Sequence, residues 1–283
     1  MVGPSLHSLP PPLARFRGRG NPALAGWGRG EDWRNLHAQT VEEVPVTEEA
    51  RVKVDVVIPV YNEERILEQS VSTLRSFLRD RCPYDWRIVI ADNASVDRTL
   101  EIAKALAARW PEVTYIHLDQ KGRGRALRRA WLESDADVVS YMDVDLSTSL
   151  EAFPPLIDSL VKGGYDLAIG SRLKKGAKVT RSLKREIISR CYNLLIKLMF
   201  RNKFSDAQCG FKALTRRAVR ELVPLVKDQA WFFDSELLLL AERKGYRIFE
   251  VPVEWVEDPD TRVKIASTAW EDIKGLVRMR FSR

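Results

Sequence analysis

The sequence has few of the residues from which disulfide frameworks and zinc sites are built. It contains three cysteines, Cys82, Cys191 and Cys209, which are odd in number, far apart in the chain and without a Cys-x-x-Cys pair. These features argue against a disulfide framework and against a zinc site, and they favour a reducing compartment.

Long apolar runs are missing as well. No run approaches the roughly 18 residues of a membrane-spanning helix, and the N-terminus lacks the apolar core of a signal peptide. With 283 residues, of which 45% are hydrophobic and 30% charged, the chain can bury a sizeable core. The composition therefore predicts a soluble globular protein.

Residues 1–50 differ in composition from the rest of the chain. They are rich in proline and glycine and hold five arginines against six acidic residues, a net charge of −1. Because the whole chain carries +7, residues 51–283 carry +8. We expect residues 1–50 to be a disordered tail and residues 51–283 to form the folded, basic domain.

In the folded part, apolar runs typical of strands alternate with amphipathic helical patterns. Strands are predicted at 54–60, 86–91, 113–118 and 138–142, and helices after residues 61–64, at 97–110 and at 124–134. This alternation predicts an α/β fold, in which a Rossmann-like, mostly parallel sheet is covered by helices on both faces.

Two carboxylates one residue apart, Asp143 and Asp145, follow the strand at 138–142 directly. Side chains at positions i and i+2 of a strand point the same way, so both acids can face one ligand. Mg²⁺ and Mn²⁺ take oxygen ligands and often share them with substrate phosphates. The pair predicts a metal-bound nucleotide diphosphate, and a surface turn with two solvated acids is the alternative.

Other polar residues are expected at the same edge of the sheet, because ligands of such sheets lie at the carboxyl ends of the strands. Glu63 and Asp92 follow the first two strands and should converge with Asp143 and Asp145. The loop 121–125 adds positive charge and glycines whose backbone amides can approach an anion. A solvated basic loop is the alternative for that segment.

Eight segments, in order and spacing, carry a resemblance to a known family. Residues 58–63, 91–97, 121–124 and 143–145 resemble the nucleotide-sugar-binding half of family-two inverting glycosyltransferases with the GT-A fold. Residues 169–172, 206–212, 231–237 and 250–255 resemble its polyprenyl-phosphate branch, the dolichyl-phosphate β-glucosyltransferases first and the mannose synthases next. The resemblance implies a nucleotide-sugar-binding half at 51–150 and an acceptor half at 151–265, followed by an amphipathic helix at 266–283.

Residue roles follow from the resemblance, one position at a time. It implies donor binding by Pro59, Tyr61, Glu63, Asp92, Lys121 and Asp143. It implies an Mg²⁺ or Mn²⁺ ion on Asp143 and Asp145, and acceptor-phosphate binding by Arg172 and Arg262. It places Asp145, Asp206, Asp234 and Arg172 in the catalytic set. Ser147 and Thr261-Arg262 depart from the mannose synthases, which usually have glutamine and Ser-Lys there, so the donor stays open between UDP-glucose, which is favoured, and GDP-mannose.

The implied reaction transfers a hexose to a polyprenyl or dolichyl phosphate with inversion. A phosphate monoester has a second pKa near 6, so this nucleophile is already anionic at neutral pH and needs no strong base. Asp206 and Asp234 could orient the acceptor or shape the donor pocket. A helix cap for Asp206 and a helix start for Asp234 are the alternatives.

A basic amphipathic segment follows in the second half. Residues 174–203 hold ten lysines and arginines against one acid, Glu186, and apolar residues recur at helical spacing from 183 to 204. Such a helix is attracted to an anionic membrane surface, and a helix docked on the core with a solvated basic face is the alternative. We expect a cytoplasmic protein, peripheral on the inner face of the membrane, and a separate membrane-protein anchor stays open.

Two other functional classes remain alternatives. A glycosyltransferase with a soluble or polysaccharide acceptor would share the donor half and differ in the second half. A nucleic-acid-binding protein would explain the pI near 9.3. However, the chain has no motif for nucleic-acid binding, and converging acids would repel phosphate, so we expect no nucleic-acid partner.

Overall fold

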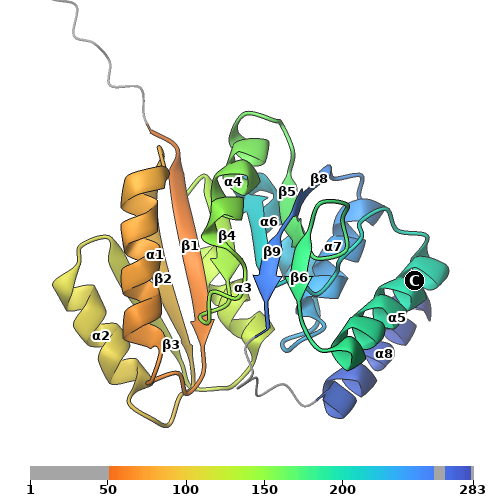
Figure 1. Ribbon diagram of the computed structural model, residues 1–283, viewed down its shortest axis with the longest axis horizontal. Coiled ribbons are helices and arrows are strands. Elements are labelled where there is room, and N and C mark those ends of the chain that lie inside the picture. The colour runs from red at the N-terminus through yellow and green to blue at the C-terminus, as the bar shows by residue number, and fades with distance from the viewer. Residues whose placement is uncertain (1–50, 258–264, 282–283) are drawn as a thin grey trace, which may run out of the picture. The chain divides into compact units, whose positions relative to one another are not determined.

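The computed structural model describes residues 51–257 and 265–281, so the predicted tail at 1–50 lies outside the described residues. The first half consists of four strands alternating with three helices, as predicted (Figure 1). These elements are β1 Lys53–Val60, α1 Leu67–Arg81, β2 Asp85–Asn93, α2 Thr99–Arg109, β3 Val113–Leu118, α3 Arg123–Glu133 and β4 Val138–Met142.

The second half completes the sheet and adds helices at one end. Its elements are α4 Phe153–Val161, β5 Leu167–Ser171, β6 Lys178–Thr180, α5 Leu183–Phe200, β7 Phe211–Thr215, α6 Arg216–Leu222, α7 Phe233–Arg243, β8 Ile248–Pro252, β9 Glu254–Val256 and α8 Ile265–Phe281. Two short 3-10 helices, η1 Leu150–Ala152 and η2 Val223–Leu225, complete the described part.

The main sheet has seven strands in the order β3-β2-β1-β4-β7-β5-β8. All neighbours are parallel except β7, which pairs antiparallel with both β4 and β5. The chain moves outward from β1 to β2 and β3, and then returns to the other side of β1 for β4. The carboxyl ends of β1 and β4 therefore flank a topological switch point, where ligands of open α/β sheets bind.

Helices cover both faces of the sheet because successive residues of its strands are apolar on both faces. On one face, Val56 and Ile58 of β1 belong to a core cluster with residues of α1, α2 and α4. On the other face, Val57 of β1 joins Trp131 of α3 and Leu237 of α7. The predicted α/β fold with helices on both faces is confirmed.

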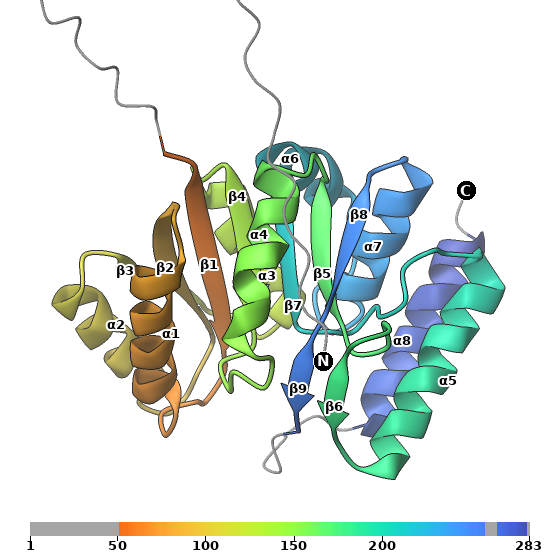
Figure 2. The ribbon, with the colours of Figure 1, turned by 45° about the horizontal axis from the view of Figure 1, so that its top comes forward.

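Helices α5 and α8 pack side by side beyond the β8 end of the sheet (Figure 2). Within the residues that the structure describes, no helix combines the length and the hydropathy needed to cross a membrane. Near these helices, β6 and β9 form a separate two-stranded parallel sheet, and Trp255 of β9 bridges to Thr148. The segment after the Asp143–Asp145 pair is thereby joined to β9.

Candidate active site

The loops that follow β1 and β2 are fastened to each other. The Asn62 amide donates to Ser95 Oγ at 2.9 Å, and Asn62 Oδ1 accepts from the Val96 amide at 2.9 Å. The Glu63 amide donates to Thr99 Oγ1 at 2.8 Å. Asn62 adopts a positive φ of 56°, which asparagine tolerates better than most residues. The two loops that carry the first two predicted donor motifs are therefore held together by hydrogen bonds.

Asp92 lies near the end of β2, and its carboxylate is buried. Its Oδ2 lies 2.6 Å from His117 Nδ1, whereas its buried Oδ1 has no hydrogen-bond partner among the described residues. A buried acceptor without a partner is rare and calls for a ligand or water. Asp92 is thus held by His117 and has one oxygen left to accept from a donor group. The sequence did not single out His117, because it lies within a predicted strand.

The loop 121–125 lies against both motifs. Lys121 Nζ sits 3.7 Å from the centroid of the Tyr61 ring, and the Gly122 amide donates to Asn93 Oδ1 at 2.7 Å. Pro59, Tyr61 and Glu63 are half-buried at the end of β1. The structure therefore brings together the predicted donor residues on strands one and two and the basic loop.

The two acids of the metal motif are presented by a turn and not by a strand. Strand β4 ends at Met142, the Leu146 amide donates to the Asp143 carbonyl at 3.2 Å, and Leu146 has a φ of 52°. The prediction that strand alternation aligns Asp143 and Asp145 is wrong, because the chain reverses there. Asp145 is exposed, and its Oδ1 accepts from the Ser147 amide at 3.0 Å.

Asp143 lies between opposing electrostatic influences. Burial raises its pKa most, Arg123 opposes the rise, and the charges of Asp145 and Asp234 add to it, so that the pKa is raised overall. A Cβ atom at Gly210 would lie 1.9 Å from Asp143 Oδ2, so only glycine leaves room for this carboxylate.

These residues fit a metal ion that is shared with a nucleotide. The described residues contain no group of three or more His, Cys, Asp or Glu side chains placed to hold a metal on their own. Mg²⁺ typically takes one or two carboxylates and completes its shell with water and substrate phosphates. Asp143 and Asp145 suit that pattern, and a cation would relieve the repulsion that raises the pKa of Asp143.

Asp234 is the centre of a buried charge cluster. Its Oδ1 accepts from the Tyr141 hydroxyl at 2.5 Å and lies 3.0 Å from Lys212 Nζ, and its Oδ2 accepts from Arg123 Nη1 at 3.1 Å. Burial and the Asp234 charge raise the pKa of Tyr141, which keeps its hydroxyl protonated as a donor. Asp234 is the second residue of α7, so the helix-start alternative is confirmed, but both oxygens are engaged.

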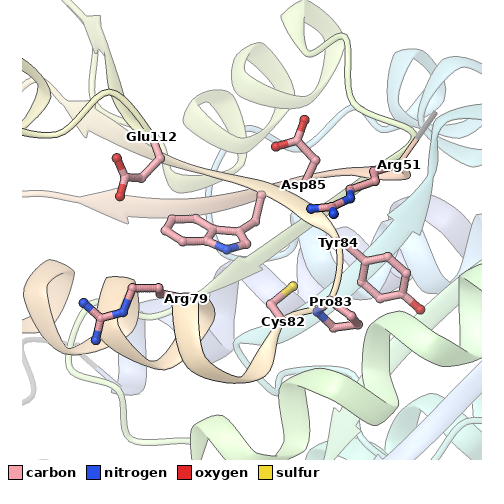
Figure 3. Close-up of a pocket in the computed structure, with 8 residues that line it drawn as sticks. Arg51, Arg79, Cys82, Pro83, Tyr84, Asp85 and Glu112 are labelled. Carbon is pink, nitrogen blue, oxygen red and sulfur yellow. The ribbon is translucent and has the colours of Figure 1, made fainter. Parts of the chain in front are cut away.

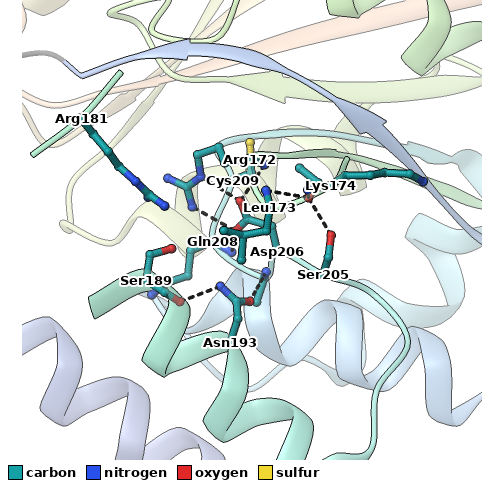
Figure 4. A network of polar contacts seen from close by, with 12 residues as sticks. Arg172, Leu173, Lys174, Arg181, Ser189, Asn193, Ser205, Asp206, Gln208 and Cys209 are labelled. Atoms are coloured by element: carbon teal, nitrogen blue, oxygen red, sulfur yellow. Dashed lines mark hydrogen bonds and ion pairs between the residues drawn. The ribbon is translucent and has the colours of Figure 1, made fainter. Parts of the chain in front are cut away.

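The Asp206 carboxylate also has both oxygens bound, in this case by the guanidinium of Arg172 (Figure 4). Arg172 donates from Nε and Nη2 at 2.8 and 3.0 Å, and the amides of Arg172 and Gln208 donate to the same carboxylate, each at 3.1 Å. Burial alone would raise the pKa of Asp206, but Arg172 outweighs it and the pKa is lowered. No helix begins at Asp206, so the capping alternative is wrong.

Arg172 faces the segment that follows the metal motif. Its guanidinium carbon lies 5.5 Å from the ring centroid of Trp255, the residue that bridges to Thr148. Burial lowers the pKa of Arg172, but the charge of Asp206, and to a smaller extent that of Asp143, outweighs burial and raises the pKa overall. Arg172 therefore lies within electrostatic range of the first acid of the metal motif. Arg262, the other predicted phosphate ligand, lies outside the described residues.

A cavity of about 510 Å³ lies elsewhere, at the opposite end of the sheet (Figure 3). Its lining includes Cys82 and Tyr84, and also Asp85, which begins β2. The predicted donor residues follow the carboxyl ends of the strands, so this cavity is separate from the candidate site.

Comparison with known proteins identifies the family. Residues 55–223 match the domain called glycosyl transferase family 2. The chain belongs to this family. The predicted resemblance to glycosyltransferases is therefore confirmed, and the match covers both the metal motif and the Arg172 and Asp206 loops.

Curated relatives include two enzymes whose names specify dolichyl or dolichol phosphate. The chain is 40% identical over 233 residues to glycosyltransferase AglD of Haloferax volcanii, covering 80% of this chain but 36% of that protein. It is 28% identical to a dolichyl-phosphate beta-glucosyltransferase of Saccharomyces cerevisiae, covering 83% and 76% of the two chains. It is 34% identical to a dolichol-phosphate mannosyltransferase of Pyrococcus furiosus, covering 71% and 56%. The chain thus spans about a third of the length of AglD.

Solved structures of the same fold are also available. A glucosyl-3-phosphoglycerate synthase from Mycobacterium tuberculosis in complex with UDP superposes with a TM-score of 0.63 at 19% identity, covering 90% of this chain and 86% of that one. Another structure of that enzyme, with Mn²⁺, UDP and phosphoglyceric acid, gives a TM-score of 0.60 at 20% identity, covering 81% and 78%. The predicted GT-A fold is confirmed by this likeness.

Proposed function

We propose that the chain transfers a hexose from a nucleotide-sugar to a polyprenyl phosphate with inversion, and that UDP-glucose is favoured over GDP-mannose. The observation that carries the proposal is an asymmetry of the crevice. Asp92 near the end of β2 and Asp145 after β4 have carboxylate oxygens available for a ligand, whereas Asp206 and Asp234 are paired with cations. The names of the dolichyl-phosphate relatives support the acceptor class.

The donor would lie across the ends of β1, β2 and β4. Asp92 Oδ1 would accept a hydrogen bond from the nucleobase, because it is buried and His117 holds the other oxygen. Pro59, Tyr61 and Glu63 would line the base and ribose, and Lys121 would approach the diphosphate over the Tyr61 ring.

Asp143 and Asp145 would hold Mg²⁺ or Mn²⁺ together with the diphosphate. The ion would take up the negative charge that develops on the leaving nucleoside diphosphate. Support comes from the electrostatic influence of Asp145 on Asp143 and from the related fold solved with Mn²⁺ and UDP. Gly210 would keep Asp143 free to approach the ion.

The acceptor phosphate would attack the anomeric carbon as an anion. Its second pKa near 6 removes the need for a base at neutral pH. Arg172, oriented by the bidentate contact with Asp206, would steer this phosphate, since a guanidinium fork suits phosphate oxygens. Asp206 would therefore act through Arg172 and not as a proton acceptor.

A surface for the lipid is available on α5 and α8. Apolar side chains are exposed on both helices, namely Leu183, Ile187, Leu194, Leu198, Trp270, Ile273, Val277 and Phe281. Cationic side chains flank them, among them Lys184, Arg190, Lys197, Lys274 and Arg280. An apolar stripe with basic flanks suits an anionic membrane surface. The unpaired cysteines suit a reducing compartment, so we place the protein on the inner face of the membrane, with or without a membrane-protein anchor.

Transfer of labelled sugar into the organic phase tests the proposal. UDP-glucose and GDP-mannose are each supplied with polyprenyl phosphate, polyprenol or soluble saccharides in parallel reactions. We expect label on polyprenyl phosphate only, and more from UDP-glucose. Label on polyprenol or a soluble saccharide with inert polyprenyl phosphate would replace the proposal with a soluble-acceptor glycosyltransferase.

A further inference from the structure

We infer that Arg123 makes metal binding conditional on the nucleotide, by occupying Asp143 when no donor is bound. The inference rests on the proposed function of Asp143 and Asp145 as metal ligands. Arg123 is the first residue of α3, its side chain is 12% exposed, and its two terminal nitrogens point to different carboxylates. Nη2 pairs with Asp143 Oδ1, and Nη1 donates to Asp234 Oδ2 at 3.1 Å.

The guanidinium is fixed by more than these two ion pairs. Its carbon lies 5.1 Å from the ring centroid of Tyr141 and 5.1 Å from that of Trp231, so two aromatic rings contact it. Such cation–π contacts stabilise a positive charge that is partly removed from water. The start of α3 packs closely against α7, because a Cβ atom at Gly124 would lie 2.6 Å from Phe233 Cβ.

Charge balance explains why a metal alone would be disfavoured. Asp143, Asp145 and Asp234 carry three negative charges, and Arg123 and Lys212 carry two positive charges, so the cluster has a net charge of −1. A divalent ion on Asp143 would add two positive charges beside a guanidinium that cannot lose its proton. Water screens the repulsion between these cations only in part, because the Asp143 side chain is 44% exposed whereas that of Arg123 is 12% exposed.

A nucleoside diphosphate removes this conflict. Its phosphate oxygens can accept from the guanidinium that leaves Asp143, and they complete the coordination of the metal at the same time. Metal and nucleotide should therefore bind as a pair, with strong positive coupling between them. By thermodynamic linkage, the metal must raise the affinity for the nucleotide by the same factor.

The test measures Mn²⁺ binding to the full chain by electron paramagnetic resonance, with and without UDP. For the wild type we expect weak binding of Mn²⁺ alone and tight binding with UDP. In Arg123→Gln, Mn²⁺ alone should bind about tenfold more tightly and the coupling to UDP should shrink. Arg123→Lys keeps the charge and should retain most of the coupling. Arg79→Gln removes an exposed charge of α1 at the opposite end of the sheet and should change nothing.

Two results would overturn the inference: equal Mn²⁺ affinity of the wild type with and without UDP, or no tightening in Arg123→Gln. If Arg123→Gln fails to fold, the double variant Arg123→Gln/Asp234→Asn leaves the net charge of the cluster unchanged and must show the same tightening. Failure of the proposed metal site is a separate outcome. It would appear as wild-type protein that binds no Mn²⁺ with UDP, or as Asp145→Asn binding it normally.

Discussion

The two sides of the crevice hold their charged groups in opposite ways. On the donor side, among the residues that the structure describes, Asp92 Oδ1 lacks a partner and Asp145 accepts from a backbone amide alone, and Asp143 is paired with Arg123. On the acceptor side, Asp206 is bound by Arg172, Asp234 by Lys212 and Arg123, and Glu236 by Arg278. The donor side is prepared to accept ligands, whereas the acceptor side orients cations. This division suits a nucleophile that arrives already charged.

The strongest test of the donor side is Asp145→Asn. Loss of one of two carboxylates should lower the transfer rate at least about a hundredfold, because the metal can no longer be held against the charge of the diphosphate. Transfer rate and Mn²⁺ dependence are measured together. Asp80→Asn on the exposed face of α1 is the control and should leave both unchanged. Full turnover of Asp145→Asn in EDTA would contradict the assignment.

The acceptor side is tested by two variants. One removes the charge of Arg172 alone, and the other removes the charges of Arg172 and Asp206 together. Arg172→Gln alone leaves Asp206 buried and unpaired, which should destabilise the fold by about 3–5 kcal/mol. Arg172→Gln/Asp206→Asn should recover most of that stability. We expect the double variant to bind UDP normally but to need about thirtyfold more polyprenyl phosphate for half-maximal rate, the loss of two charge-assisted contacts.

Thermal unfolding, UDP titration and acceptor saturation separate these effects. A double variant that is stable and has an unchanged requirement for polyprenyl phosphate would show that Arg172 only braces Asp206. In that case the acceptor phosphate must find its cation elsewhere.

Gly210→Ala sharpens the comparison within the donor side. The added methyl would lie 1.9 Å from Asp143 Oδ2, so the carboxylate must move away from Gly210. We expect about a tenfold loss of affinity for Mn²⁺ with UDP, and a smaller effect on UDP alone. Isothermal titration calorimetry measures both. Equal losses with and without the metal would place the effect on the nucleotide pocket instead.

The lipid surface is tested by neutralising Lys184 and Lys197 to glutamine. Each cation near an anionic membrane is worth about 1 kcal/mol, so vesicle binding should weaken by roughly thirtyfold at low salt and converge with the wild type at high salt. Arg185 is unsuitable for this test, because it pairs with Glu257 at 2.8 Å. If neither salt nor these substitutions changes co-sedimentation with vesicles, the membrane contact must be made by apolar residues alone.

The smallest effect on transfer is expected from substitution of Asp272 in α8. This substitution should instead change how the stability of the fold depends on pH. Burial, with the charges of Asp228, Asp234 and Glu271, raises its pKa to about 7, against the hydrogen bond from Gln208. The folded state then binds more protons than the unfolded state, so the stability contributed by the neutral acid is present at low pH and declines as pH rises from about 4 to 7. Asp272→Asn should flatten that part of the curve of unfolding free energy against pH, as measured in urea. An unchanged slope would place the pKa of Asp272 near its usual value.

Much of the fold could be predicted from the sequence, because it depends on local patterns. The alternation of apolar runs and amphipathic helical patterns predicts the elements from β1 to β4. The spacing of Asp143 and Asp145 after an apolar run predicts the metal motif. The antiparallel β7 was not predicted, because a short apolar run such as Phe211–Thr215 carries no signal for its direction. Its placement depends on contacts with β4 and β5, which are distant in the chain.

The partners of the site residues were the other part that sequence could not supply. Arg123 appeared only as one charge of a basic loop, and Lys212 and Tyr141 only as parts of apolar or motif segments. Their roles arise where α3, β4, β7 and α7 meet, which no local spacing encodes. The turn at Leu146 likewise depends on a positive φ that leucine rarely adopts.

The pairing of Asp206, Asp234 and Glu236 also bears on water. A water molecule is a poor nucleophile unless a base removes its proton, and these three carboxylates are already committed to arginine or lysine. Hydrolysis of the bound donor should therefore be slow even though Asp145 is exposed to solvent. Release of UDP from UDP-glucose without acceptor measures this directly. The lifetime of the activated sugar would then be set by the arrival of an anionic acceptor and not by exclusion of solvent.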